Sequence, residues 1–128
     1  MDGTVAIAAP TNGLVKDILA RLTVEGIEAV EIGADSGNGR SGVHVGTMHR
    51  FKGLEYQRMI IAGASDGLLP RRRIAVLQDR DPTAYKRERQ KDRSLLFVAV
   101  TRARDDLAVF WHGTPSPFLT SLTRGSGT

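Results

Sequence analysis

Short apolar runs alternate with a helical pattern in the first quarter of this chain, and that alternation most constrains its fold. The run TVAIAAP, residues 4–10, favours a β-strand and is closed by a proline. The run IEAVEI, residues 27–32, is a second strand with alternating apolar positions. Between them, one helical face collects Leu14, Ile18, Leu19 and Leu22. A strand, a helix and a strand joined so closely form a β-α-β unit, whose crossover implies parallel strands.

The two ends of this first helix carry capping residues. Thr11 or Asn12 can cap its start by accepting a hydrogen bond from a backbone N–H of the first turn. Gly26 can end it, because glycine adopts the left-handed conformation that closes many helices. The sequence therefore predicts a helix between these positions.

The same alternation continues to the end of the chain. Three further segments are predicted strands: VHVGT (43–47), YQRMIIAGA (56–64) and DLAVFWHG (106–113). Between the last two, SDGLLPRRR is predicted as a loop. The segment TAYKRERQKDRSLLFVAVTRAR (83–104) is ambiguous, because LLFVAV alone could be a strand, but continuity favours one long helix with Asp81 or Thr83 as its cap. We therefore predict an α/β fold, a mainly parallel sheet flanked by helices on both faces.

The composition narrows the class of protein. At 128 residues and 41% hydrophobic content, residues 1–128 suit a single compact domain. There is no cysteine, and the three histidines show no metal-ligand spacing, so we expect no metal site. No apolar run approaches the roughly 18 residues of a membrane span, and no signal peptide is recognisable, so we expect a cytoplasmic protein without a membrane partner.

Positive charge is concentrated in the second part of the chain. Residues 1–48 carry three Lys/Arg and six Asp/Glu, whereas residues 49–128 carry fifteen and eight. Clustered cations favour polyanions such as nucleic acid or nucleotide phosphates, although charge alone equally fits an ordinary solvated surface.

A glycine-rich stretch, GADSGNGRSG at residues 33–42, is predicted to be a flexible connection. Its glycines at 37 and 42 imitate the spacing of a phosphate-binding loop. The imitation fails because Val43 stands where the motif needs lysine, and because a strand, not a helix, is predicted to follow.

The stretch TMHRFKGLE gathers ionic chemistry at the end of a predicted strand. We expect this strand to deliver Thr47, His49, Lys52 and Glu55 to the carboxyl edge of the sheet, where parallel α/β folds bind ligands. Gly53 would let the backbone approach a ligand, the lysine could contact phosphate, and the glutamate could accept hydrogen bonds from sugar hydroxyls. The alternative is a helix start with ordinary surface charges.

A second motif, RSLLFVAVTRAR at residues 93–104, projects guanidinium groups from a buried helix. This arrangement suits an arginine that stabilises charge on a transferring phosphoryl group. The alternative is an arginine at the C-terminal end of a helix, paired with the helix dipole.

The two motifs together resemble two motifs of a known family, and they follow one another in the same order along the chain. The segment GTMHRFKGLEYQRMIIAGASDGLLP resembles motif V of the UvrD/Rep/PcrA group of superfamily 1 DNA helicases, and DRSLLFVAVTRARDDLAVFW resembles motif VI. The opening VAIAAPTNGLVKDILARLTVEGIEAV resembles the family segment that places Thr-Asn before a helix. TMHRFKGLE and WHGTPSPFL are similar in particular to actinobacterial UvrD-like helicases. The resemblance covers nearly the whole chain.

The resemblance implies a RecA-like three-layer fold of the P-loop NTPase type, namely the second lobe, 2A, of an ATP-driven DNA translocase. In that family pattern, Arg102 would be the arginine finger on the γ-phosphate of ATP. Glu55 would hold the ribose, and the backbone around Gly53 would lie beside the triphosphate.

The resemblance also implies a site for single-stranded DNA. Thr47 and His49 would face the DNA strand and link its position to the nucleotide. Asn12 is a weaker DNA-binding candidate, since a plain helix cap explains it equally well. Lys52 would serve DNA, ATP or a structural ion pair, and the motif does not choose among them.

The departures from the family pattern matter equally. The chain has no G-x-x-x-x-G-K-[ST], no Walker B acidic pair and no Asn-Tyr-Arg-Ser segment. The Mg²⁺ ligands that accompany ATP are therefore expected on a missing N-terminal RecA-like (1A) lobe, the expected partner. Residues 33–42 stand where the family often inserts a 2B subdomain, so a minimal 2A lobe, excised or truncated, is expected, and alone it should not hydrolyse ATP. The alternative is a non-catalytic RecA-like module that binds nucleic acid or protein.

Two smaller features stay open at this stage. Phe110 and Trp111 could stack on bases, but within a predicted strand they are expected to be core and edge residues. The run Arg71 to Arg73 could contact phosphates or merely keep a loop soluble, and the second interpretation is favoured.

Overall fold

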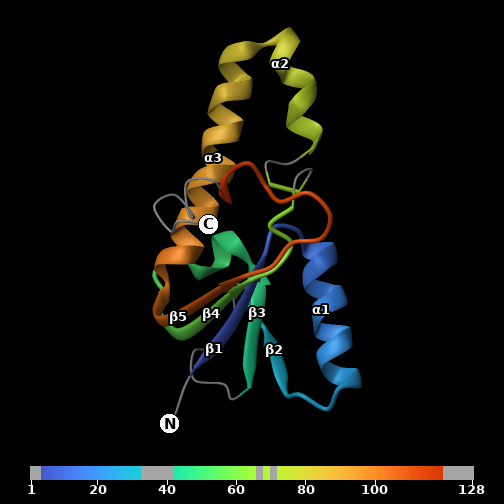
Figure 1. Cartoon of the computed structure of the whole chain (residues 1–128), viewed down its shortest axis with the longest axis vertical. Helices are drawn as coiled ribbons and strands as arrows, with labels where there is room; N and C mark the ends of the chain where they lie inside the picture. Colours follow the sequence, from blue (N-terminus) through green and yellow to red (C-terminus); the bar gives the residue numbers. More distant parts are fainter. Residues whose placement is uncertain (1–3, 33–41, 66–67, 70–71, 120–128) are drawn as a thin grey trace.

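The computed structural model describes residues 4–32, 42–65, 68–69 and 72–119. Its elements follow the predicted alternation of strands and helices (Figure 1). In chain order they are β1 (Val5–Ala9), α1 (Asn12–Val24), β2 (Ala29–Glu31), β3 (Val43–Thr47), the 3₁₀ helix η1 (Met48–Phe51), β4 (Tyr56–Ile61), the 3₁₀ helix η2 (Arg72–Val76), α2 (Leu77–Arg80), α3 (Pro82–Thr101) and β5 (Ala103–Val109).

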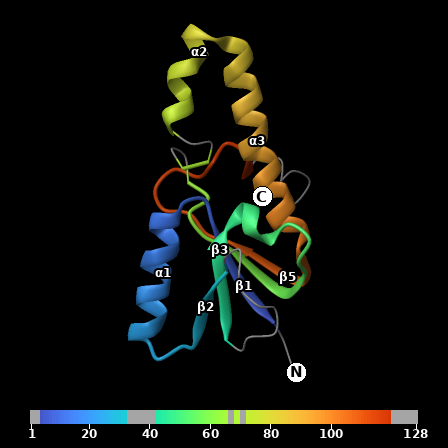
Figure 2. The ribbon, with the colours of Figure 1, turned by 180° about the vertical axis from the view of Figure 1, so that it is seen from behind.

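Five parallel strands form one sheet in the order β2-β3-β1-β4-β5. The predicted parallel pairing is confirmed, although β3 lies between the two strands of the first β-α-β unit. All five strands therefore point the same way and share one carboxyl edge and one amino edge. Helix α1 covers one face and helix α3 the other, which makes three layers (Figures 1 and 2).

Helix α1 begins and ends where its capping residues indicate. The Thr11 hydroxyl accepts a hydrogen bond from the backbone N–H of Leu14 at 3.2 Å, so Thr11 is the cap and Asn12 is the first helical residue. Gly26 follows the helix with φ +76°. The predicted apolar face packs against a buried cluster of three residues, Ala9, Val15 and Val45.

Helix α3 is a single helix of 20 residues, as continuity favoured. Asp81 caps it by accepting a hydrogen bond from the N–H of Ala84 at 3.1 Å. Its second half is buried through Leu96 and Ala99, both fully inaccessible to solvent. They join the larger core cluster, whose largest fully buried side chains are Phe51, Met48, Met59, Ile61 and Leu96.

Two predictions in the second half of the chain are wrong, and a third is wrong at its end. Strand β5 begins at Ala103, so Ala103 and Arg104 extend from the sheet rather than from a helix. Phe110 and Trp111 follow the end of β5 and are 59% and 49% exposed, so neither is a core residue. The expected loop SDGLLPRRR, residues 65–73, overlaps the start of η2, and α2 lies just after it in a stretch without a sequence-based prediction.

The glycine-rich stretch and the arginine run of the sequence lie largely outside the part of the chain that the structure describes. The glycine-rich stretch 33–42 lies, apart from Gly42, outside the described residues, as do the side chains of Arg71 to Arg73. Val43 begins a strand, which agrees with the rejection of a phosphate-binding loop. Among the described residues, no helix combines the length and apolar character needed to cross a membrane.

Candidate functional site

The predicted site residues lie at two opposite edges of the sheet. Strand β3 ends at Thr47 and β4 begins at Tyr56, and both strands are parallel to β1. The connection between them must therefore run from the carboxyl edge back to the amino edge, with η1 on the way. Thr47 and His49 stay at the carboxyl edge, whereas Glu55 immediately precedes β4. The expectation that one edge holds all four motif residues is therefore wrong for Glu55.

At the amino edge, the two sequence motifs meet through one backbone hydrogen bond. The N–H of Tyr56 donates to the carbonyl of Arg102 at 2.8 Å. Helix α3 ends at Thr101 and β5 begins at Ala103, so Arg102 is the joint between them. This bond fixes Glu55 beside Arg102 in the folded chain, although 46 positions separate the two in sequence.

The side chain of Tyr56 anchors this joint from inside the core. It is 6% exposed, and its hydroxyl lies 2.7 Å from Nδ1 of His44 in a hydrogen bond. Its ring packs edge-on against His44 and Phe51, with centroid separations of 5.4 and 5.7 Å. Burial raises the pKa of the Tyr56 phenol. Sequence reasoning missed both His44 and Tyr56, and the aromatic residue directly after KGLE was the available signal.

The Arg102 side chain is held incompletely by its surroundings. One terminal nitrogen donates to the Thr101 hydroxyl at 3.1 Å. Its Nε is buried and has no hydrogen-bond partner within the described part of the chain. A guanidinium has five N–H donors in a planar fork, so this one keeps donor capacity for an anionic group.

Gly53 and Glu55 complete the amino edge. Both are exposed. Gly53 has φ +82°, and a Cβ added there would meet no atom within 4 Å. The backbone of this turn is therefore open to a neighbouring molecule, in a conformation that other residue types adopt with strain. Lys52, also exposed, follows η1 directly.

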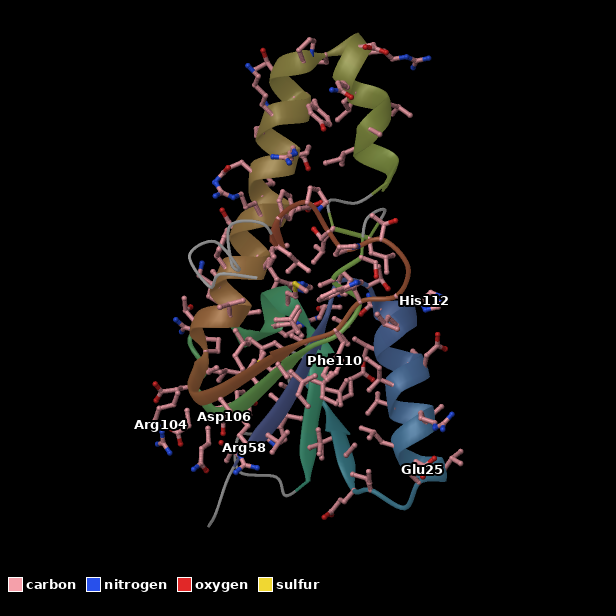
Figure 3. All side chains as sticks on the ribbon, viewed as in Figure 1. Glu25, Arg58, Arg104, Asp106, Phe110 and His112 are labelled. Carbon is pink, nitrogen blue, oxygen red and sulfur yellow. The ribbon has the colours of Figure 1, made fainter. Side chains whose placement is uncertain are left out.

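Exposed charges also surround the first residues of β4 and β5. Arg58 and Asp106 form an ion pair of 3.3 Å between the two strands. Hydrogen bonds from Gln57 and then Arg104 lower the pKa of Asp105. Figure 3 places Arg58, Arg104 and Asp106 at this end of the sheet, with His112 at the opposite end.

At the carboxyl edge, Thr47 and His49 are in contact. The Thr47 hydroxyl lies 3.1 Å from Nδ1 of His49. Thr47 is 6% exposed, whereas His49 is exposed. Thr47 pairs with Ala9 of β1, and the chain then continues through Pro10 to the exposed Asn12. Three of the four predicted DNA-binding residues, Asn12, Thr47 and His49, are therefore brought to the same edge.

A pocket of about 330 Å³ opens beside His49. Its lining comes from the residue after β1, the start of η1, residues 68–69 after β4 and the middle of α3: Pro10, Met48, His49, Leu68, Leu69, Glu88, Lys91, Asp92 and Leu95. The lining combines apolar side chains with Glu88, Lys91 and Asp92 from α3, so the pocket offers both apolar surface and charged groups to a ligand. The α3 residues of this pocket were not among the sequence-predicted site residues.

Comparison with known proteins identifies the family. Residues 11–114 match the UvrD-like helicase C-terminal domain, and that span includes every predicted site residue. The chain belongs to the UvrD-like helicase C-terminal domain family. A solved structure described as the C-terminal domain of a possible DNA helicase from Lactobacillus plantarum WCFS1 superposes with a TM-score of 0.64 at 24% identity, covering 91% of this chain and 61% of that one. The predicted RecA-like α/β fold is confirmed.

Curated relatives of this UvrD-like domain include two named helicases. The ATP-dependent DNA helicase UvrD2 of Mycobacterium tuberculosis (strain H37Rv) is 37% identical over 76 residues. The ATP-dependent DNA helicase PcrA of Staphylococcus aureus (strain Mu50) is 33% identical over 75 residues. Each alignment covers 59% of this chain and 10% of the relative. The domain thus matches about a tenth of the length of these relatives.

Proposed function

We propose that this UvrD-like domain is the C-terminal RecA-like lobe of an ATP-dependent DNA helicase acting in the cytoplasm. It would contribute an arginine finger to an ATP site and part of a track for single-stranded DNA. The observation that carries this proposal is the separation of the candidate residues onto opposite sheet edges. Gly53, Glu55 and Arg102 share the amino edge, whereas Asn12, Thr47 and His49 share the carboxyl edge.

The amino edge has the groups that a nucleotide needs. The Nε of Arg102, which is buried and has no hydrogen-bond partner among the described residues, supports a role in donating to a γ-phosphate. The exposed carboxylate of Glu55 can accept hydrogen bonds from ribose hydroxyls, and the open turn at Gly53 leaves space for the phosphates. ATP, when bound, supplies the phosphoanhydride bond whose cleavage drives movement. Arg102, Glu55 and the turn at Gly53 therefore fit a bound ATP molecule.

Arg102 would act by electrostatic stabilisation. Charge accumulates on the oxygens of a phosphoryl group as it transfers, and a guanidinium fixed beside it lowers that barrier. The bond between the Arg102 carbonyl and Tyr56 N–H holds the joint, so little reorganisation is needed. We propose that the phosphate-binding loop and the Mg²⁺ ligands come from an N-terminal RecA-like lobe facing this edge.

The carboxyl edge would bind single-stranded DNA. The exposed imidazole of His49 is oriented by Thr47, and Asn12 adds an amide from the start of α1. Only η1 and a four-residue turn, 52–55, separate the DNA edge from the nucleotide edge. A shift of this connection on nucleotide binding would move His49, which gives a direct route for coupling.

The test joins this chain to an N-terminal RecA-like lobe of a UvrD-like helicase and measures DNA-stimulated ATP hydrolysis. The isolated chain should be inactive, and the joined protein active. Arg102→Ala should lower turnover by about 10³- to 10⁵-fold, the range typical of arginine fingers. The matched control is Arg104→Ala, because Arg104 is an exposed arginine two residues away that pairs with Asp105 at 3.5 Å. Equal effects of the two substitutions, or hydrolysis by the isolated chain, would refute the assignment.

A further inference from the structure

Helix α3 extends beyond the sheet on the side of the candidate DNA edge. It runs antiparallel to the strands, because its C-terminal end leads directly into the amino end of β5. Its 20 residues span about 30 Å, longer than the roughly 20 Å of a six-residue strand. Figures 1 and 2 show its first half, together with α2, projecting past the carboxyl edge.

The projecting half of α3 carries positive charge on its exposed positions. From Pro82 to Ser94, the exposed charged residues are Lys86, Arg87 and Lys91, and none is acidic. The two carboxylates of this stretch, Glu88 and Asp92, are half-buried and buried. The nearest exposed carboxylates precede the helix, at Asp79 and Asp81.

The exposed charges of helix α1 differ from those of α3 and are typical of a helix face that only meets solvent. Its exposed charges mix both signs, with Lys16, Asp17 and Arg21. Lys16 pairs with Glu31 at 2.7 Å, and Arg21 pairs with Glu25 at 3.1 Å. A helix face that only meets solvent has no need for exposed charges of one sign. The exposed positive charge on the projecting half of α3, called here the stripe, therefore indicates an anionic partner.

The stripe on α3 is continuous with the candidate DNA edge. Lys91 lines the pocket that also contains His49. It also lines a second, shallow hollow of about 490 Å³ on α3, which is formed by Arg87, Gln90, Lys91, Ser94 and Leu95 and has an almost entirely apolar surface, so the charged groups of this half of α3 lie at its margin rather than in it. Lys91 is therefore shared by two depressions, one at the sheet edge and one along the projecting helix.

We propose that Arg87 and Lys91, which lie four positions apart on one side of α3, form a phosphate-binding surface that continues the single-stranded DNA path from His49 along the projecting half of the helix. The inference rests on the proposed DNA-binding function. From Leu95 to Arg87 the helix adds about 12 Å to the path. The contacts are to phosphates, so this surface adds affinity and footprint without base preference.

The existing ion pairs do not oppose this role. Glu88 lies 3.8 Å from Arg87 and 3.2 Å from Lys91. The two cationic side chains are 62% and 63% exposed, and ion pairs at such positions contribute little. A DNA phosphate can take up their remaining donors while Glu88 stays in place.

The test compares two double variants of the full chain that change charge equally. Arg87→Gln with Lys91→Gln removes two cations from the stripe, and Lys16→Gln with Arg21→Gln removes two from α1. Both lower the net charge from +4 to +2, and the α1 side chains are similarly exposed, at 66% and 77%. Binding to fluorescent oligo(dT) of increasing length is measured by anisotropy across a salt series, and circular dichroism checks folding.

The double variant of Arg87 and Lys91, the α3 pair, should bind DNA with a weaker salt dependence than wild type. The slope of log affinity against log salt concentration should be smaller by up to about 1.4, the value for two phosphate contacts on single-stranded DNA. Between 50 and 200 mM salt, wild-type affinity should then fall about 7-fold more than that of the α3 pair. The loss of affinity in the α3 pair should appear only with oligonucleotides long enough to reach past the His49 pocket. The α1 pair should behave like wild type, because its charges lie on the other face of the sheet.

Equal behaviour of the two double variants would overturn the inference, as would a deficit that is the same for every oligonucleotide length. His49→Ala separates this failure from failure of the proposed function. If His49→Ala weakens binding while the α3 pair does not, only the inference fails. If wild type binds no single-stranded DNA, the DNA part of the proposed function fails with it.

Discussion

Tyr56→Phe removes a single hydroxyl from the joint that holds the two sequence motifs together. That hydroxyl is hydrogen-bonded to Nδ1 of His44 at 2.7 Å, and Tyr56 itself is only 6% exposed. The ring and its contacts with Phe51 remain, so the substitution isolates the hydrogen bond from the packing. Removing one partner of a buried pair costs about 1–2 kcal/mol, which combines the lost bond and the poorer solvation of the remaining group.

The expected change in melting temperature follows from the size of the chain. At about 2.1 cal/mol/K per residue, 128 residues give an unfolding entropy of about 0.27 kcal/mol/K. A loss of 1–2 kcal/mol then lowers the melting temperature by about 4–7 °C. Urea unfolding followed by circular dichroism measures the free energy, and Tyr85→Phe, which removes the other tyrosine hydroxyl, is the control.

The pH dependence gives this prediction a second readout. Burial raises the pKa of Tyr56 in the folded state above its ordinary value of 10.0. The unfolded chain therefore loses this proton first, so the stability contributed by the neutral phenol is complete below pH 10 and is lost as pH rises above it. Phenylalanine has no proton to lose, so the stability gap between wild type and Tyr56→Phe should narrow above pH 10. A variant as stable as wild type at pH 7, or a gap that widens at high pH, would refute the reasoning.

Three further predictions concern the fold that positions the site. Leu96→Ala should cost about 2–5 kcal/mol of unfolding free energy in urea, because Leu96 is fully buried in the main core; a cost under about 1 kcal/mol would contradict that placement. Asp81→Ala should cost about 1 kcal/mol through loss of the α3 cap, and Asp81→Asn, which keeps an acceptor, should recover most of it in the same assay. Gly63→Ala should destabilise more than Gly53→Ala in thermal unfolding, because both glycines have positive φ but only at Gly63 would a Cβ collide, with Leu14; the reverse order would contradict the packing.

Local patterns predicted most of the fold. The first helix and the long α3 could be predicted because their periodicity agrees with their caps at Thr11 and Asp81. The start of β5 could not, because Thr-Arg-Ala-Arg contains good helix formers and no glycine or proline. Pairing of Ala103 with Tyr56 on β4 ends the helix there, so a tertiary contact overrides the local preference.

The sequence indicates candidate site residues, whose roles stay predictions, but it did not indicate their arrangement. The motif places Thr47 and Glu55 eight positions apart, but the sheet separates them onto opposite edges because β3 and β4 are parallel. His44 and Tyr56 were missed because their hydrogen bond joins two different strands, and no local sequence pattern predicts such a contact. Phe110 was expected in the core from its apolar character, yet its position after the last paired residue of an edge strand leaves it exposed.

The central claim is that the two edges of this sheet have different ligands, and a crossed comparison of two variants tests it most directly. In the chain joined to an N-terminal RecA-like lobe, ATP turnover and affinity for single-stranded DNA are measured for Arg102→Ala and for His49→Ala. The account predicts that Arg102→Ala abolishes turnover and leaves DNA affinity within about twofold, whereas His49→Ala weakens DNA binding and retains basal turnover. If Arg102→Ala weakens DNA binding while turnover persists, or if each variant impairs both activities equally, the assignment of the edges is contradicted.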